Sequence, residues 1–365
     1  IYPNKAMEQY AEYVSLEELY DFSRLHSLEA LVHCGISQLD LNEEDPVLRH
    51  WSNRAQMILT QSIVQLAERD TLFAELNGCG IALLPVKGSW LKEAYPQIDF
   101  RQMSDLDILI HRENRKQARK IMLAFGYEED FEESETYHDS YVKKPYVAVE
   151  LHSQLLSDKN PHSGYYETVW EKAEAVDGNS LLRRLPAEDE YIYFFLHMKK
   201  HMEEAGCGIR YLLDCFVYRN NNPQWNRDYL QQEFRKLGML DFVQKMEQLS
   251  DCWFSTGEPI PPELEKLEAC VLWTGTYGHV DNLLQHRVDE MKQKYKNPVV
   301  FQIVYWSSRF FRPLDEMKCH YRLLEKLPVL LPVFWIVRIA EKLIEKPEAI
   351  LHHIKQISNE GKRHD

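Results

Sequence analysis

The chain has 365 residues, of which 44% are hydrophobic and 27% are charged, and its formal net charge is −14. A chain of this length can bury a large core and is expected to form two or three structural units. The excess of acidic residues argues against broad, sequence-blind binding of nucleic acids, because such binding depends on a basic surface.

Helix signals dominate the first part of the chain. The stretch Ser15–Glu18 has the capping-box pattern and predicts a helix that reaches about Cys34. Asp45-Pro46 predicts the start of a second helix, with proline at its first position, and Asn77-Gly78 predicts its end. The apolar stripe of this long helix indicates that it packs on the sheet of the segment that follows.

Two strand-like runs follow, on either side of a Gly-Ser step. The apolar run Ile81–Val86 ends at Lys87-Gly88-Ser89, which predicts a strand-to-helix turn capped by Ser89. The run Asp105–Ile110 first alternates between acidic and apolar residues and is then apolar. This pattern predicts a strand whose first residues are exposed to solvent. Because alternate residues of a strand share a face, Asp105 and Asp107 are expected to point the same way.

These two aspartates predict a cation site. Carboxylates at the spacing of alternate strand residues, about 6.5 Å, repel by roughly 2.5 kcal/mol at an effective dielectric near 20. A divalent cation would turn this repulsion into attraction, and oxygen ligands suit magnesium. On the same argument, Asp107→Asn is expected to relieve repulsion, so that the metal-free protein melts no lower than before.

After a helix predicted over about Glu113–Phe125, two strands or an irregular hairpin are expected over Thr136–Lys144 and Pro145–Leu155. The second of these strands carries Glu150 between apolar neighbours. Strand signals fade after about residue 161, and helices are expected over residues 186–201, 209–218, 227–237, 239–251, 262–273, 277–293 and 339–357.

A Gly-Ser step followed by Asp-x-Asp resembles the nucleotidyltransferase superfamily typified by DNA polymerase beta, whose members carry a third carboxylate on a later strand. A longer ordered set resembles more closely an uncharacterised bacterial nucleotidyltransferase family of that superfamily. The set consists of Lys87-Gly88, Tyr95-Pro96, Arg101, Asp105-Leu106-Asp107 and Glu150-Leu151-His152. The resemblance continues through His197, His201 and Arg210–Asp214, and covers most of the chain from about residue 80.

The resemblance implies an α+β fold. A small mixed-sheet nucleotidyltransferase core is expected at residues 79–156, with an N-terminal helical segment at 1–78 packing on it. A large C-terminal helical region, residues 157–365, is expected to form the second wall of the cleft. The implied reaction moves a nucleoside monophosphate from a nucleoside triphosphate to a hydroxyl of a small molecule or protein, and releases pyrophosphate.

The resemblance also implies roles for individual residues. Two Mg²⁺ ions, with Mn²⁺ as an alternative, would be held by the catalytic acids Asp105, Asp107 and Glu150. The backbone of Gly88 and Ser89 and the Ser89 hydroxyl would bind the β- and γ-phosphates, a role that suits a helix N-terminus. The cationic residues expected near the triphosphate are Lys87, Arg101 and Arg210.

Several alternatives stay open. Glu150 replaces the usual aspartate, and Lys87 and Arg101 are also consistent with ordinary surface cations. Arg210 and Asp214 have the spacing of a helical ion pair. The whole chain is also compatible with a non-catalytic nucleotide-binding or scaffold protein, or with a pyrophosphokinase or phosphotransferase. Neither the acceptor nor the triphosphate is identified by these residues.

The sequence gives little support for a zinc site or for a membrane-spanning helix. His197 and His201 have the spacing of half a zinc site but lack the glutamate of H-E-x-x-H. The seven scattered cysteines contain no C-x-x-C pair and indicate reduced thiols in a cytoplasmic protein. The apolar stretch Leu327–Val337 contains two prolines, is shorter than a spanning helix, and predicts a buried helix start.

Overall fold

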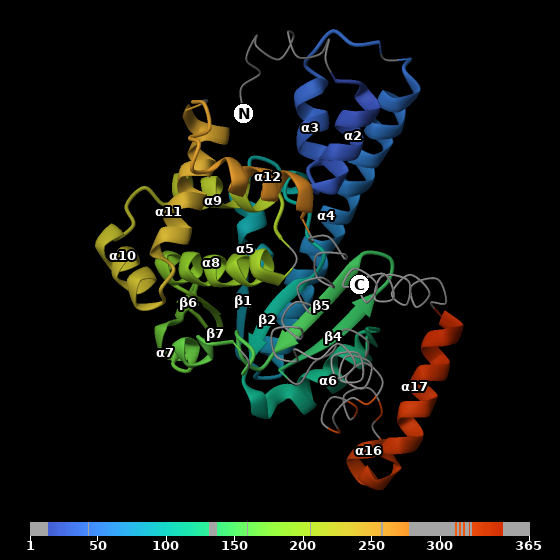
Figure 1. Cartoon of the computed structure of the whole chain (residues 1–365). Coiled ribbons are helices and arrows are strands. Elements are labelled where there is room, and N and C mark those ends of the chain that lie inside the picture. Colours follow the sequence, from blue (N-terminus) through green and yellow to red (C-terminus); the bar gives the residue numbers. More distant parts are fainter. Residues whose placement is uncertain are drawn as a thin grey trace, which may run out of the picture. The chain divides into compact units, whose positions relative to one another are not determined.

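The computed structural model describes residues 14–276, apart from 43, 131–136, 159, 205 and 257, and residues 311, 314, 317, 321 and 323–345 (Figure 1). The chain divides into two compact units. The first consists of Ile1–Glu129 and Ser140–Leu283, and the second of Asp130–Asp139 and Leu284–Asp365. The boundaries at 78/79 and 156/157 expected from the sequence stay predictions.

The described strands form one mixed sheet in the order β3-β4-β5-β2-β1-β7-β6. The central strand β2 runs antiparallel to β1 and parallel to β5, while β1 also pairs with β7 in parallel. An α+β fold is thereby confirmed. The strands are β1 (Leu83–Val86), β2 (Leu106–Ile110), β3 (Glu128–Glu129), β4 (His138–Lys143), β5 (Val147–His152), β6 (Glu174–Val176) and β7 (Asn179–Arg184).

Helices precede, interrupt and follow this sheet. The N-terminal helices are α2 (Leu16–Leu25), α3 (Glu29–Ile36) and α4 (Pro46–Gly78). Within the sheet region lie α5 (Gly88–Leu91), η1 (Lys92–Ala94), η2 (Ile98–Phe100), η3 (Arg112–Asn114), α6 (Arg115–Ala124), η4 (Ser163–Tyr166) and α7 (Val169–Lys172). After the last strand come α8 (Ala187–Glu204), α9 (Ile209–Asn221), α10 (Arg227–Lys236), α11 (Leu240–Asp251), the π-helical turn η5 (Cys252–Thr256) and α12 (Glu265–Thr274).

The sheet has a different hydrophobic core on each face. Ile108 and Ile110 pack with Leu76 of α4 and Met122 of α6, whereas Leu109 belongs to the core of α8 and α9. Because side chains alternate along a strand, odd-numbered residues of β2 face α8 and even-numbered ones face α4. In β5 the alternation is opposite, since Val149 and Leu151 lie in the α4 core. Asp107 and Glu150 are therefore on the face that α8 covers.

Local capping explains the helix starts in the N-terminal segment. Ser15 and Glu18 form the expected capping box, and the Asp45 side chain accepts from the backbone N–H groups of Val47 and Leu48. The single helix predicted up to Cys34 is wrong, because it is divided into α2 and α3. Ser27 has a φ of 53°, a left-handed conformation that an α-helix cannot include.

The expectation of helices alone after residue 161 is also wrong. Strands β6 and β7 form a hairpin that extends the sheet beyond β1. Asp177 and Gly178 at its turn both have positive φ, and Asp-Gly is a strong two-residue hairpin signal. Because β7 is largely polar, this pair of strands lacks the apolar runs from which strands are usually predicted.

The second unit contains α16 (Leu323–Lys326), η6 (Pro328–Leu330) and α17 (Leu331–Glu345). A helix does begin in the stretch Leu327–Val337, but the side chains of Val329 and Ile336 are exposed and not buried as expected. No described helix combines the length and the apolar character needed to cross a bilayer. The predicted helix 277–293 and the end of the predicted helix 339–357 lie outside the described residues.

Candidate active site

The three acids singled out in the sequence lie together beside the start of β2. Asp107 of β2 is the register partner of Glu150 of β5, and Asp105 directly precedes β2. One carboxylate oxygen from each of the three lies within 4.8 Å of the others. We call Asp105, Asp107 and Glu150 the carboxylate cluster. Three converging carboxylates offer the oxygen ligands that Mg²⁺ and Mn²⁺ prefer, so these residues fit such an ion.

Asp107 is buried and held by two basic side chains. Its Oδ1 lies 2.7 Å from the Lys87 Nζ and 2.9 Å from the His152 Nε2. Burial alone would raise the pKa of Asp107, but Lys87 and His152 hold that pKa well below its usual range. Because these contacts favour the ionised form, loss of this charge is now expected to remove stabilising contacts as well as repulsion.

The repulsion instead affects Asp105. Burial, and then the charge of Asp107, raise the pKa of Asp105 to about 6. Ser104 Oγ donates a hydrogen bond of 2.6 Å to Asp105 Oδ1. Glu150 is partly exposed and its Oε2 lies 3.2 Å from the His152 Nε2. Burial would lower the pKa of His152, but its contacts with Asp107 and Glu150 raise it. The cluster thus brings three carboxylates together around two basic side chains, Lys87 and His152.

The Lys87–Ser89 turn runs beside this cluster under backbone strain. Lys87 has φ 54° and ψ −124°, a conformation that favours glycine and that other residues adopt at a cost of about 1–3 kcal/mol. In this conformation the Lys87 ammonium group contacts the Asp107 carboxylate. Ser89 does not cap α5 as expected: the residue is fully buried, and its hydroxyl donates to the backbone oxygen of Asp107 at 3.3 Å.

Gly88 is the one position of this turn where a side chain has no room. A Cβ there would lie 2.5 Å from Arg101 Nη1 and 3.0 Å from Met103 Sδ. Arg101 cannot easily move away, because its Nε and Nη2 donate to the two carboxylate oxygens of Asp214 at 2.8 and 3.0 Å. The glycine of the Lys87-Gly88 pair therefore permits close packing of the turn on a buried guanidinium.

A second charged group, which we call the Arg101–Asp214 cluster, consists of Tyr95, Arg101 and Asp214. All three side chains are buried, and the Tyr95 hydroxyl donates to Asp214 Oδ1 at 2.6 Å. The cluster connects the segment before β2 to α9. Both oxygens of Asp214 face Arg101, so the guanidinium is engaged within the protein. Arg210, also on α9, donates from Nη1 to the Gln102 backbone oxygen at 3.0 Å.

Helix α8 contributes further side chains near the acids. Burial, and then the Lys87 charge, lower the pKa of His197 well below its usual value, and the same causes lower that of His201 to about 4. Their Nε2 atoms lie 3.1 Å apart, so one neutral ring donates to the other. In the described part of the chain, no third His, Cys, Asp or Glu converges with them on a metal position.

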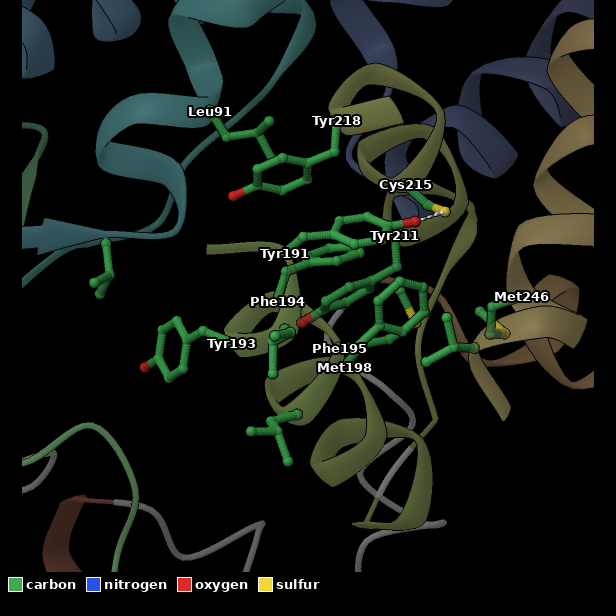
Figure 2. Close-up of a cluster of buried hydrophobic side chains, with 14 of the residues drawn as sticks. Leu91, Tyr191, Tyr193, Phe194, Phe195, Met198, Tyr211, Cys215, Tyr218 and Met246 are labelled. Carbon is green, nitrogen blue, oxygen red and sulfur yellow. Dashed lines mark hydrogen bonds between the residues drawn. The ribbon is translucent and has the colours of Figure 1, made fainter. Parts of the chain in front are cut away.

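Tyr193 projects from the same helix, apart from the cluster of Tyr191, Phe194 and Phe195 (Figure 2). Burial raises the pKa of Tyr193 even though Lys87 opposes the shift, and its hydroxyl donates to the Leu155 backbone oxygen at 3.4 Å. Sequence reasoning missed Tyr193 because it lies in an unbroken apolar and aromatic run, where nothing distinguishes one ring from the next.

A second missed residue is Arg69 of α4. Arg69 Nη1 donates to the Ser89 backbone oxygen at 2.7 Å, and its Nη2 donates to Glu93 at 2.6 Å. The guanidinium also lies 5.5 Å from the centre of the Trp90 ring. The sequence did contain a signal for Arg69, because polar residues interrupt the buried stripe of α4. This stripe consists of Ile58, Ser62, Gln65, Arg69, Leu72 and Leu76.

Comparisons with known proteins agree with this arrangement. No curated protein and no solved structure matches the chain. One family model, described as an uncharacterised nucleotidyltransferase, matches residues 13–255, which is more than half of the chain and includes the turn and all three acids. The chain therefore belongs to this family of uncharacterised nucleotidyltransferases.

Proposed function

We propose that this nucleotidyltransferase is metal-dependent and transfers a nucleoside monophosphate from a nucleoside triphosphate to a hydroxyl group, with release of pyrophosphate. The observation that carries the proposal is the convergence of Asp105, Asp107 and Glu150 within 4.8 Å, beside the strained Lys87–Ser89 turn. A site that only binds nucleotide has no need for three crowded acids. An in-line displacement at phosphorus does need such acids, because the metal ions that they hold can neutralise charge on the entering and leaving oxygens.

The roles of the residues follow from their positions. Asp105 and Asp107 would hold two Mg²⁺ or Mn²⁺ ions, and Glu150 would complete the second ligand set or accept the proton of the attacking hydroxyl. Lys87, now 2.7 Å from Asp107, would compete with a metal for that carboxylate. Once displaced, its ammonium would be available for the triphosphate oxygens, close to the backbone of Gly88 and Ser89.

We assign the two arginines different roles. Because Asp214 engages Arg101, we assign Arg101 to holding the turn, where it packs against Gly88, and not to binding phosphate. Arg210 supports the backbone at Gln102, three residues before Asp105, and so bears on the position of the first acid.

The test is to follow labelled phosphates in the presence of magnesium. Triphosphates labelled at the α, the β or the γ position are incubated with the protein, and the expected result is an α-label on the acceptor and free pyrophosphate that carries the β- and γ-labels. Transfer of the γ-phosphate alone would indicate a phosphotransferase, and transfer of the β,γ-pyrophosphoryl group would indicate a pyrophosphokinase. Binding without any turnover would indicate the scaffold alternative.

Two variants make the test specific to the carboxylate cluster. Glu150→Gln keeps the size of the side chain but removes its charge and its capacity to accept a proton, so transfer should fall steeply. Glu128→Gln is the matched control, because Glu128 is an exposed residue on β3 of the same sheet. Equal activity of the two variants would contradict the role given to Glu150.

A further inference from the structure

A polar cavity of about 280 Å³ lies among α2, α3, α4 and the segment that leads into β2. Its walls include Ser27 from the turn between α2 and α3, Gln61 and Gln65 from α4, and Ser104. We call it the α4 cavity. Ligand pockets typically measure about 300–1,000 Å³, so this volume suits a small ligand.

The α4 cavity adjoins the carboxylate cluster through one residue. Ser104 lines the cavity, and its hydroxyl donates to Asp105 Oδ1 at 2.6 Å. Gln65, which also lines the cavity, fixes the backbone here by donating from Nε2 to the oxygens of Met103 and Tyr146 at 2.9 and 3.2 Å. A molecule in this cavity would therefore lie next to the first acid of the cluster.

Two features indicate that the cavity serves a ligand. Gln65, which lines the cavity, is 2% exposed, and its Oε1 has no hydrogen-bond partner among the described residues. Buried polar atoms rarely stay unpaired, so this unpaired amide beside the cavity points to a polar occupant of the space. Ser27, which also lines the cavity, has a φ of 53°. Backbone strain of this kind tends to occur at ligand sites.

The charges of the cavity favour an uncharged ligand. Arg54 donates from Nε and Nη2 to Glu29 Oε1 at 3.3 Å, and Gln102 donates to the other oxygen of this buried carboxylate. Arg24 pairs with Asp21 at 3.2 Å. Each cation of the lining thus has an acid beside it. The remaining polar groups of the wall are hydroxyls and amides, which recognise hydroxyl groups by exchanging hydrogen bonds.

We propose that the α4 cavity binds the acceptor, and that this acceptor is a small, neutral, polyhydroxylated molecule of the monosaccharide or cyclitol class. This inference rests on the proposed nucleotidyl transfer. One hydroxyl oxygen of the acceptor forms a bond to the α-phosphorus, and the bond from that phosphorus to the β-bridging oxygen breaks. Pyrophosphate leaves, and the hydroxyl proton passes to a Glu150 oxygen. Hydroxyl and amide groups of the cavity lining, such as those of Ser27 and Gln61, exchange hydrogen bonds with its other hydroxyls and so orient the ring.

The first experiment measures binding without chemistry. Saturation-transfer NMR is recorded on the full chain with D-glucose, D-ribose and myo-inositol, and with glucose 6-phosphate and glucuronate as charged counterparts. At least one neutral compound should bind, and more tightly than its charged counterpart. Gln61→Trp narrows the cavity from a half-buried position and should weaken this binding at least tenfold. Gln56→Trp, on the exposed face of the same helix, is the matched control and should bind normally.

The second experiment measures transfer. With the compound that binds, Gln61→Trp should raise the acceptor KM at least tenfold, whereas Gln56→Trp should leave it unchanged. Gln61→Ala, which keeps the cavity open, provides the same test with a smaller increase in KM if the tryptophan variant does not fold.

Failure of the inference and failure of the proposed function give different results. If no neutral compound binds, if the charged ones bind better, or if Gln61→Trp and Gln56→Trp behave alike, the cavity is not the acceptor site. If α-label transfer to another acceptor proceeds equally in Gln61→Trp, the inference is overturned and nucleotidyl transfer stands. If a neutral compound binds in the cavity but no label moves, nucleotidyl transfer and with it the acceptor role are overturned.

Discussion

Two groups of charged side chains near β2 differ in how their charges are satisfied. In the Arg101–Asp214 cluster, one guanidinium meets one carboxylate through two hydrogen bonds, and Tyr95 adds a third. In the carboxylate cluster, three acids converge, and the basic side chains of Lys87 and His152 lie beside them. The first group pairs one cation with one acid, whereas the second brings three acids together at one point. A balanced, buried pair indicates structure, and an unbalanced group indicates a ligand.

The first and largest effect expected from this contrast is on activity. Asp107→Asn should reduce transfer at least about a thousandfold, which corresponds to about 4 kcal/mol of transition-state stabilisation. It should also lower the free energy of unfolding of the metal-free protein by about 1–2 kcal/mol, because Lys87 and His152 lose a charged partner. Steady-state kinetics and urea unfolding in the presence of a chelator measure the two effects. Full activity in this variant would refute the role of the cluster.

The second prediction concerns the balanced cluster. Asp214→Ala leaves a buried guanidinium without its partner, so the free energy of unfolding should fall by about 3–5 kcal/mol. Asp241→Ala removes an acid from an exposed pair with Lys245, and should cost no more than about 1 kcal/mol. Urea unfolding compares the two variants. Similar losses in the free energy of unfolding would show that the buried pair stabilises the fold no more than the exposed pair does.

The third prediction tests how the two clusters are joined. Gly88→Ala would place a Cβ 2.5 Å from Arg101 Nη1, which Asp214 prevents from moving freely. We expect a destabilisation of about 1–3 kcal/mol and a higher KM for the triphosphate, since the turn has to shift. Gly164→Ala, whose new Cβ meets its nearest neighbour at 3.6 Å, should change neither quantity. Thermal unfolding and kinetics distinguish the two variants.

The smallest expected effect depends on pH. Lys92 is fully buried beside Arg101, and burial, then the Arg101 charge, lower its pKa to about 7. Between about pH 7 and 10.5 the unfolded chain binds the extra proton, so the wild type should gain stability as the pH rises through this window. Lys92→Met removes the titrating group, so its stability relative to wild type should be most favourable near pH 7. The advantage should shrink toward pH 10, as followed by urea unfolding at several pH values. An advantage that does not change with pH would contradict the assignment.

Much of the candidate site was predictable from local patterns. The shared face of Asp105 and Asp107 follows from the two-residue period of a strand, and the starts of α2 and α4 follow from their caps. The family resemblance added Glu150, which the structure places opposite Asp107 in register. These features depend on residues close together in the chain, or on a motif whose order is visible in the sequence.

The partners of the charged residues were decided by tertiary structure. Arg101 and Asp214 are 113 positions apart, and no local pattern distinguishes this buried pair from the expected phosphate-binding arginine or from a helical pair with Arg210. The same holds for Lys87 and His152, whose contacts with Asp107 shift the acid–acid repulsion onto Asp105. The α4 cavity likewise needs Ser27, Gln65 and Ser104 from three separate segments. Secondary structure is determined by neighbours along the chain, whereas the charge state and partners of a buried group depend on what the whole fold brings within a few ångströms of it.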